Sequence, residues 1–282
     1  VMWGSVLVYA GSIVGLVGLG LVLRPTRWLG VPTRGRALLL AAAGALLAML
    51  GLALPVREQH ITRVATRLDA FVPVWQFREA HTLSVAAPPA RVYEAIRSVR
   101  ADEILLFRAL TWLRRGGRPL PPSILNAGKR ESLIDVATSS SFVLLADSAP
   151  GELVVGTVVM APPGAHGTLT PRAFQEPLPP GFAVAVMNFL VTADEAGGSV
   201  VATETRVFAN SPATRRRFAA YWRIIYPGSA LIRRMWLRAI RHRATRPGAP
   251  DSVRGRGATI DTDRPDQVVL PPGAPAAATQ SR

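Results

Sequence analysis

The side chains best suited to chemistry in this sequence form two pairs, each separated by a single residue. Glu79 and His81 lie in one run of alternating polar and apolar residues, and Glu204 and Arg206 lie in another. Residues i and i+2 of a β-strand point to the same face, so each pair presents two polar groups together. A histidine can exchange a proton near neutral pH, and an arginine can hold a carboxylate or phosphate. Proton transfer and the binding of an anionic group are therefore the chemistries to consider.

Other catalytic signatures are missing from the sequence. The four histidines, His60, His81, His166 and His242, are scattered without HExxH spacing, and neither a GxSxG elbow nor a P-loop occurs. The lack of cysteine excludes disulfides, thiolate catalysis and cysteine-ligated metal. We expect no cofactor and no metal. Glu103 and Glu152 have plain structural explanations, a first-turn helix carboxylate and a cross-strand pair respectively.

The polar pairs must be positioned by a mixed α+β domain. Alternation predicts a first strand over Phe77 to Val85, and Pro88 and Pro89 open a helix with the apolar stripe Val92, Ala95, Ile96 and Val99. A second helix is predicted from about Asp102 to Leu113. Short β runs follow, which predict an antiparallel sheet: Phe142 to Ala146, Glu152 to Met160, Phe182 to Thr192 and Ser199 to Phe208. Ser211 and Pro212 then open a long C-terminal helix, which we expect Pro227 and Gly228 to kink.

Two uncharged apolar runs precede this domain. They extend over about residues 1–23 and 37–56, and each is long enough to cross a bilayer as a helix. We therefore predict a transmembrane hairpin over 1–56; a cleaved signal peptide is the alternative for the first run, but it lacks a basic leading region. Gly11 and Gly15, with Gly44 and Ala48 in the second run, have the small-residue spacing that permits close helix packing, within the hairpin or in a dimer.

Arginines near the runs predict the orientation in a plasma membrane. The connecting loop carries Arg24, Arg27, Arg34 and Arg36 and no acid, which favours a cytoplasmic loop and an extracytoplasmic domain. Arg57, Arg63 and Arg67 after the second run weaken this bias. Residues 57–76 are expected to be a juxtamembrane linker, amphipathic over Glu58 to Phe71 and lying near the interface. The domain occupies 77–245, and the Pro- and Gly-rich residues 246–282 are expected to be a disordered tail.

The chain is strongly basic, with 33 basic and 18 acidic residues and a net charge of +15. The C-terminal helix carries many of the arginines, among them Arg215, Arg216, Arg233 and Arg234, and we expect these four to face a membrane surface with anionic lipid. An ordinary solvated helix face is the alternative. Nucleic acid is not an expected partner, because no DNA- or RNA-binding motif is found.

Several short motifs resemble the START-like superfamily, also called SRPBCC or polyketide cyclase/lipid transport. They are Phe77-Arg-Glu79-Ala-His81, Ala87-Pro-Pro-Ala-Arg-Val92, Glu152-Leu-Val-Val-Gly156, Thr203-Glu204-Thr205-Arg206-Val207, and Tyr221-Trp222-Arg223 through Pro227-Gly228-Ser229. The resemblance covers roughly Phe77 to Arg243. It implies a helix-grip fold, in which a curved antiparallel sheet holds the long C-terminal helix and encloses an apolar cavity.

In such a fold the first and last strands are neighbours, which would bring Glu79 and His81 beside Glu204 and Arg206. We expect these four residues, with Phe107 and Trp222, to contact a ligand. The alternatives are an ion-pair network that fixes strand register, or a solvated sheet face.

Three functions remain open at this stage. The first is a membrane-anchored domain that binds a lipid or another hydrophobic small molecule in its cavity. The second is a cyclase- or hydratase-like enzyme with His81 as acid/base and Glu79 or Glu204 orienting it. The third is an interaction protein with a collapsed cavity that docks on lipid or a partner.

Overall fold

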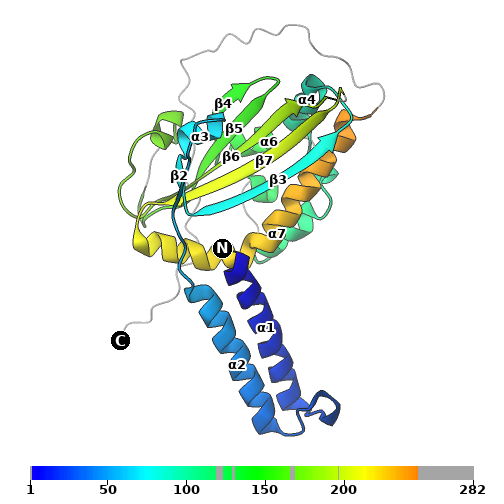
Figure 1. The fold of residues 1–282 in the computed structure, drawn as a ribbon, viewed down its shortest axis with the longest axis vertical. Coiled ribbons are helices and arrows are strands. Elements are labelled where there is room, and N and C mark those ends of the chain that lie inside the picture. Colours follow the sequence, from blue (N-terminus) through cyan, green and yellow to red (C-terminus); the bar gives the residue numbers. More distant parts are fainter. Residues whose placement is uncertain (1, 119–122, 129–130, 166–168, 196, 247–282) are drawn as a thin grey trace. The chain divides into compact units, whose positions relative to one another are not determined.

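The computed structural model describes residues 2–118, 123–128, 131–165, 169–195 and 197–246 (Figure 1). The chain divides into two compact units. The hairpin unit comprises residues 1–57 and 215–227, and the sheet unit comprises residues 58–214 and the chain from Gly228 onward. The expected disordered tail lies outside the described residues from position 247 onward.

The hairpin unit contains two apolar helices, α1 (Met2–Leu23) and α2 (Arg34–Ala53), with a short 3₁₀ turn, η1 (Arg27–Leu29), between them. Both helices are long and apolar enough to cross a membrane. Large apolar side chains point away from the helix pair; Leu16 and Leu39, for example, are 68% and 71% exposed. The second helix ends at Ala53, three residues before the predicted end of the run.

Small residues bring the backbones of α1 and α2 into contact. A Cβ added at Gly11 would lie 2.5 Å from the amide nitrogen of Ala48, and one added at Gly18 would lie 2.5 Å from that of Ala41. Any larger side chain at these positions would push the helices apart. The predicted small-residue spacing therefore serves packing within one chain.

Residues 215–227, the first part of helix α7 (Pro212–Ala244), also belong to the hairpin unit. Arg223 is 1% exposed, and its guanidinium donates hydrogen bonds to the carbonyl oxygens of Leu52 and Leu54 at the end of α2. The last carbonyls of a helix lack partners within the helix and carry partial negative charge, so a cation there stabilises the helix end. Tyr9 of α1 donates a hydrogen bond of 2.5 Å to the carbonyl of Ile224.

The sheet unit is built on five antiparallel strands in the order β3-β7-β6-β5-β4. Their bounds are β3 (Phe77–Val85), β4 (Val143–Ser148), β5 (Glu152–Met160), β6 (Ala183–Ala193) and β7 (Ser199–Ala209). The predicted strands agree with these bounds to within two residues at each end. The first and last strands are neighbours, as expected, and the architecture is the α+β helix-grip class (Figure 1).

The helices of the sheet unit are short except for its share of α7. They are α4 (Pro89–Ser98), η2 (Ala101–Glu103), α5 (Phe107–Arg114), η3 (Ile124–Asn126), α6 (Leu133–Thr138) and η4 (Pro171–Phe174). The single helix predicted from Asp102 to Leu113 is wrong, because Leu106 adopts a left-handed conformation with φ of 61° that interrupts it. Helix α7 continues across Pro227, and the boundary between the two units falls at that residue.

The segment 58–75, here called the strap, differs most from expectation. It contains β1 (Gln59–His60), α3 (Arg67–Phe71) and β2 (Val74–Trp75), and it packs on the sheet. Leu68 is 1% exposed, in a cluster with Val154 and Val186 of the sheet. Of the apolar stripe that predicted an amphipathic segment, Ile61, Leu68 and Phe71 pack with the strands, whereas Val64 is 63% exposed. Its position near a membrane interface stays a prediction.

One face of the sheet carries the main core. Val85, Val201 and Phe189 from three strands pack with Trp236 and Ile240 of α7. The rings of Phe189 and Trp236 meet edge to face with centroids 4.9 Å apart. We call this the inner face; the strap covers part of the other, outer face.

Candidate functional site

Strand register decides which of the candidate residues meet. Glu79 lies opposite Thr205 and His81 opposite Thr203, whereas Glu204 lies opposite Ala80. Directly opposed residues share a face, so Glu79 and His81 are on the inner face while Glu204 and Arg206 are on the outer face. The predicted convergence of all four is therefore wrong, because a change of one residue in register exchanges the two faces of a strand.

The inner polar cluster is centred on Glu79, which is 3% exposed. Its Oε1 lies 3.0 Å from Nε2 of His81, and its Oε2 accepts a hydrogen bond of 2.9 Å from the hydroxyl of Ser229 on α7. The side chain of His81 is 12% exposed. A carboxylate at this distance orients the imidazole ring.

Arg233 lies one helical turn after Ser229, and its charge interacts with that of Glu79. Burial lowers the pKa of Arg233, the negative charge of Glu79 opposes that change, and the positive charge of Arg114 adds to it. Its guanidinium carbon lies 5.9 Å from the centre of the Trp236 ring. Arg233 and Arg215 are partly buried, whereas Arg216 and Arg234 are exposed, and the expected membrane-surface position of these four arginines stays a prediction.

Two donors in this region have no hydrogen-bond partner among the described residues. They are the buried Nη1 of Arg233 and the buried indole nitrogen of Trp236. A buried polar group without a partner is costly, typically about 1–3 kcal/mol and more for a charged group. A ligand or an ordered water that accepts from these donors would remove this cost.

Helical spacing was the signal that could have located Arg233. Residues 233, 236 and 240 are related by i, i+3 and i+7, so Arg233 shares a face with Trp236 and Ile240, both of which are buried. Because most arginines of this helix are exposed, Arg233 was predicted to be exposed as well.

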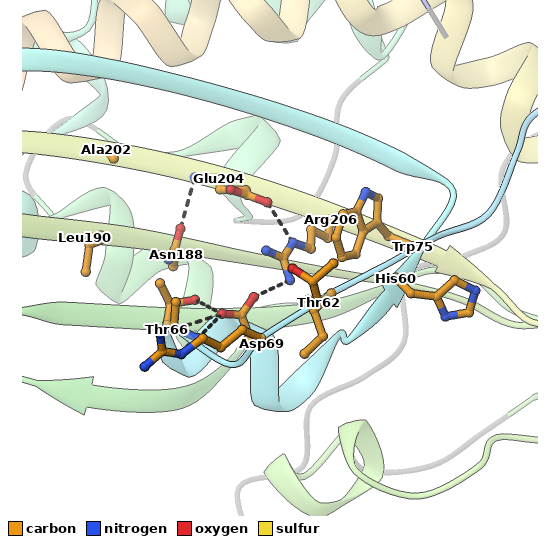
Figure 2. A pocket seen from close by; sticks show the side chains of 13 residues that line it. His60, Thr62, Thr66, Asp69, Trp75, Asn188, Leu190, Ala202, Glu204 and Arg206 are labelled. Atoms are coloured by element: carbon orange, nitrogen blue, oxygen red, sulfur yellow. Dashed lines mark hydrogen bonds and ion pairs between the residues drawn. The ribbon is translucent and has the colours of Figure 1, made fainter.

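The outer cluster is an ion-pair network that fastens the strap to the sheet (Figure 2). Arg206, 7% exposed, lies 2.7 Å from Oδ1 of Asp69 and 2.7 Å from Oε1 of Glu204, and it donates to the carbonyl of Val72 at 3.1 Å. Its guanidinium carbon lies 4.1 Å from the centre of the Trp75 ring. Two carboxylates already neutralise Arg206, so it is poorly placed to hold an anionic ligand.

Both acids of this network titrate below their ordinary range. Burial alone raises the pKa of Asp69, but amide donors from Ala65 and Thr66 and the Arg206 guanidinium outweigh it and leave the pKa lowered. Burial likewise raises the pKa of Glu204, and hydrogen bonds from Arg78 and Arg206 reverse the change. Charge-assisted hydrogen bonds of this kind favour the ionised carboxylate.

Glu152 also connects the strap to the sheet. It accepts hydrogen bonds from the backbone amides of Arg67 and Leu68 at the start of α3, at 2.7 and 3.3 Å, and from the side chain of Asn188 at 2.6 Å. Glu103 is a first-turn carboxylate, as expected, and also pairs with Arg243 at 2.9 Å. Neither carboxylate reaches the inner cluster through these contacts.

A hollow of about 320 Å³ lies between the strap and the outer face. Figure 2 shows Thr62, Thr66 and Asp69 on the strap side, with Asn188 and Glu204 on the strands. On the inner face, Phe189 lies two strands from His81, since both are paired with Thr203. Among the described residues, no three histidine or acidic side chains gather as a metal site requires.

The two apolar candidates, Phe107 and Trp222, belong to different units. Phe107 is 3% exposed and belongs to the main core. Trp222 belongs to the hairpin unit, where its ring lies between those of Phe218 and Tyr226, at centroid distances of 5.7 and 5.8 Å.

Comparison with known proteins gives a likeness of fold only. No family model matches the chain, and no curated protein matches it. A solved structure from Nitrosospira multiformis is 13% identical, with 60% of this chain and 97% of that one covered and a TM-score of 0.27. The Zhui aromatase/cyclase from Streptomyces sp. R1128 is 14% identical over 62% and 99% of the two chains, with a TM-score of 0.25. Human STARD10 is 8% identical over 58% and 62%, with a TM-score of 0.20.

These similarities are too low to carry a function to this chain. The class that the structure defines is an α+β helix-grip domain, accompanied by two helices apolar enough to span a membrane.

Proposed function

We propose that this protein is a membrane-anchored helix-grip domain that binds a lipid or another hydrophobic small molecule on the inner face of its sheet. The observation that carries the proposal is the buried donor on Arg233, whose charge interacts with that of Glu79, next to the contacts of Glu79 with His81 and Ser229. The buried indole donor of Trp236 lies three residues further along α7. A ligand with an acceptor group at one end and an apolar body would satisfy the donors.

The surroundings of the cluster suit such a molecule. Leu83 of β3 and Leu231 and Ile232 of α7 are partly buried and pack on the main core. Ligand sites commonly combine apolar walls with a few placed polar groups. The ligand's apolar part would extend along Leu83 and Ile232, with local movement of these half-buried side chains.

The membrane supplies both anchorage and ligand in this proposal. Helices α1 and α2 would form a transmembrane hairpin, with the sheet unit on the extracytoplasmic side of the plasma membrane. An apolar molecule would then pass between bilayer and domain without crossing free water, where its solubility is low.

The test compares the full chain, purified in detergent, with two variants of adjacent arginines. Arg233→Met removes the buried guanidinium and keeps an unbranched apolar side chain of similar length. Arg234→Met is the matched control, since Arg234 is exposed one residue further along the same helix. Native mass spectrometry and solvent extraction would identify molecules that co-purify with each protein.

We expect a hydrophobic molecule to co-purify with the wild-type protein and with Arg234→Met. The amount of this molecule per protein should fall at least about tenfold in Arg233→Met, which corresponds to about 1.4 kcal/mol of binding free energy. Trp236→Phe, which keeps a ring and removes the indole donor, should weaken retention in the same direction. A wild-type protein that carries no such molecule would overturn the proposal, as would equal retention in all variants.

Catalysis on a bound hydrophobic substrate is the second candidate, favoured by the contact of 3.0 Å between Glu79 and His81. In a cyclase- or hydratase-like reaction, His81 would transfer a proton and Glu79 would orient its ring. If the extracted molecule is converted on incubation with wild-type protein but not with His81→Gln, the domain is an enzyme. If neither protein changes it, the domain is a binding module.

A further inference from the structure

An unusual apolar surface surrounds α5 on the sheet unit. Leu105, Leu106, Trp112 and Leu113 are 66%, 48%, 54% and 68% exposed. Soluble surfaces seldom gather large apolar side chains in this way unless something covers them.

These side chains are held outward by the buried side of the same segment. Ile104 and Phe107 are each 3% exposed and belong to the main core. Thr111, one turn after Phe107, is also buried, and its hydroxyl donates to the Phe107 carbonyl at 2.8 Å. The opposite side of α5 therefore has to carry Trp112 and Leu113 into solvent.

The local backbone fixes this arrangement. Leu106 takes a left-handed conformation with φ of 61°, which is uncommon for a residue other than glycine, aspartate or asparagine. At the other end, the Trp112 ring lies against Gly117, whose amide donates to the Trp112 carbonyl at 3.0 Å. Arg115 donates to the side chain of Asn126 at 2.8 Å and so ties the helix end to η3.

The charged residues within this segment are all basic. Residues 104–118 contain four arginines, Arg108, Arg114, Arg115 and Arg118, and no acid. The two acids just before them have basic partners: Asp102 lies 3.3 Å from Arg100, and Glu103 lies 2.9 Å from Arg243. Exposed Trp and Leu among arginines are the features of a segment that lies in the interface of an anionic bilayer.

We propose that Leu105, Leu106, Trp112 and Leu113 form a docking surface that inserts shallowly into an anionic lipid bilayer, with the exposed Arg108 and Arg118 against the headgroups. The commitment to a bilayer follows from the one-signed charge and from two other helices of the chain that are apolar enough to enter one. It rests on the membrane anchorage proposed above.

The sequence has no cysteine, so single labels can be placed on the full chain without background. Leu113→Cys and, as a control, Thr82→Cys on an exposed position of β3 would each carry an environment-sensitive NBD fluorophore. The proteins would be reconstituted in vesicles of phosphatidylcholine alone or with 30% phosphatidylglycerol. Quenching by lipids with a shallow nitroxide reports contact with the bilayer, and quenching by iodide reports exposure to water.

We expect the label at 113, but not at 82, to be quenched by nitroxide lipid, with at least about threefold stronger quenching in the anionic vesicles. Arg108→Glu with Arg118→Glu should abolish that difference between vesicles. Quenching at 113 by iodide alone would overturn the proposal. Protection from both quenchers would also overturn it, because protein would then cover the surface.

Anchorage is scored separately by washing the same vesicles with alkaline carbonate. A chain that resists the wash but shows no nitroxide quenching at 113 disproves the docking surface and leaves the anchor intact. A chain that is washed off disproves the anchor, and quenching at 113 measured before the wash still decides whether the surface meets lipid.

Discussion

Replacing Arg206 by leucine should release the strap from the sheet. Arg206 is almost fully buried between two carboxylates, each 2.7 Å away, and it also holds the Val72 carbonyl at 3.1 Å. Its loss leaves the charges of Asp69 and Glu204 buried without their shared partner. Removing one member of a buried ion pair typically costs about 3–5 kcal/mol.

Arg78→Leu provides a matched control on the same carboxylate. Arg78 contacts Glu204 at 2.7 Å, but its side chain is 49% exposed. Ion pairs of this kind contribute about 0–1 kcal/mol. Each variant therefore removes one arginine that pairs with Glu204, and the two arginines differ mainly in how deeply they are buried.

Hydrogen exchange followed by mass spectrometry measures opening of the strap directly. Protected amides include those of Leu68, bonded to Glu152, and Val72, bonded to the Leu68 carbonyl. A loss of about 3 kcal/mol corresponds to roughly a hundredfold increase in the opening equilibrium, since each 1.4 kcal/mol is a factor of ten. We expect an increase of that order in the strap for Arg206→Leu and less than about fivefold for Arg78→Leu. Equal, small increases in strap exchange in the two variants would refute the assignment of Arg206 to a structural network. Arg206 would then again be a candidate for ligand binding.

Two further predictions concern pH and the hairpin. The pKa values of Asp69 and Glu204 are lowered from ordinary values of 3.8 and 4.5, so their contribution to stability is complete above pH 4.5 and is lost as pH falls through the lowered values. The melting temperature should therefore fall between pH 7 and pH 3, and it should fall less in Asp69→Asn. An equal fall in both proteins would contradict this prediction. In α1, Gly18→Leu should destabilise the hairpin by about 1–3 kcal/mol, the usual cost of overpacking, because Ala41 occupies the space that the new side chain needs. Gly20→Leu is the control, because a Cβ added at Gly20 meets no atom within 4 Å. Melting temperatures in one detergent test this, and equal values for the two variants would contradict the packing described.

The sequence was a good guide to elements whose periodicity continues over many residues. Strand β5 has its predicted bounds, Glu152–Met160, because Gly151 and the proline-rich segment after Met160 mark its ends. The apolar runs became α1 and α2 for the same reason. The strap could not be found in this way, since its strands have two residues each and its helix has five.

The candidate site was only half predictable. Alternation placed Glu79 with His81 and Glu204 with Arg206, which the structure confirms for each pair. Whether the pairs share a face depends on the register between β3 and β7, and a shift of one residue exchanges the two faces of a strand. Arg233 was assigned to the surface because charge alone was counted, although its spacing to Trp236 placed it on the buried stripe.

The most direct test of the central proposal asks where a membrane-derived molecule binds. The full chain would be reconstituted in vesicles that contain a fatty acid with a photoactivatable group and an alkyne tag, irradiated, and digested for mass spectrometry. We expect labelled peptides from β3 around Leu83 and from residues 229–233 of α7, in addition to labelling of α1 and α2 by the surrounding bilayer. Labelling confined to α1 and α2, with the inner face unlabelled, would contradict the proposal that this domain takes a hydrophobic ligand.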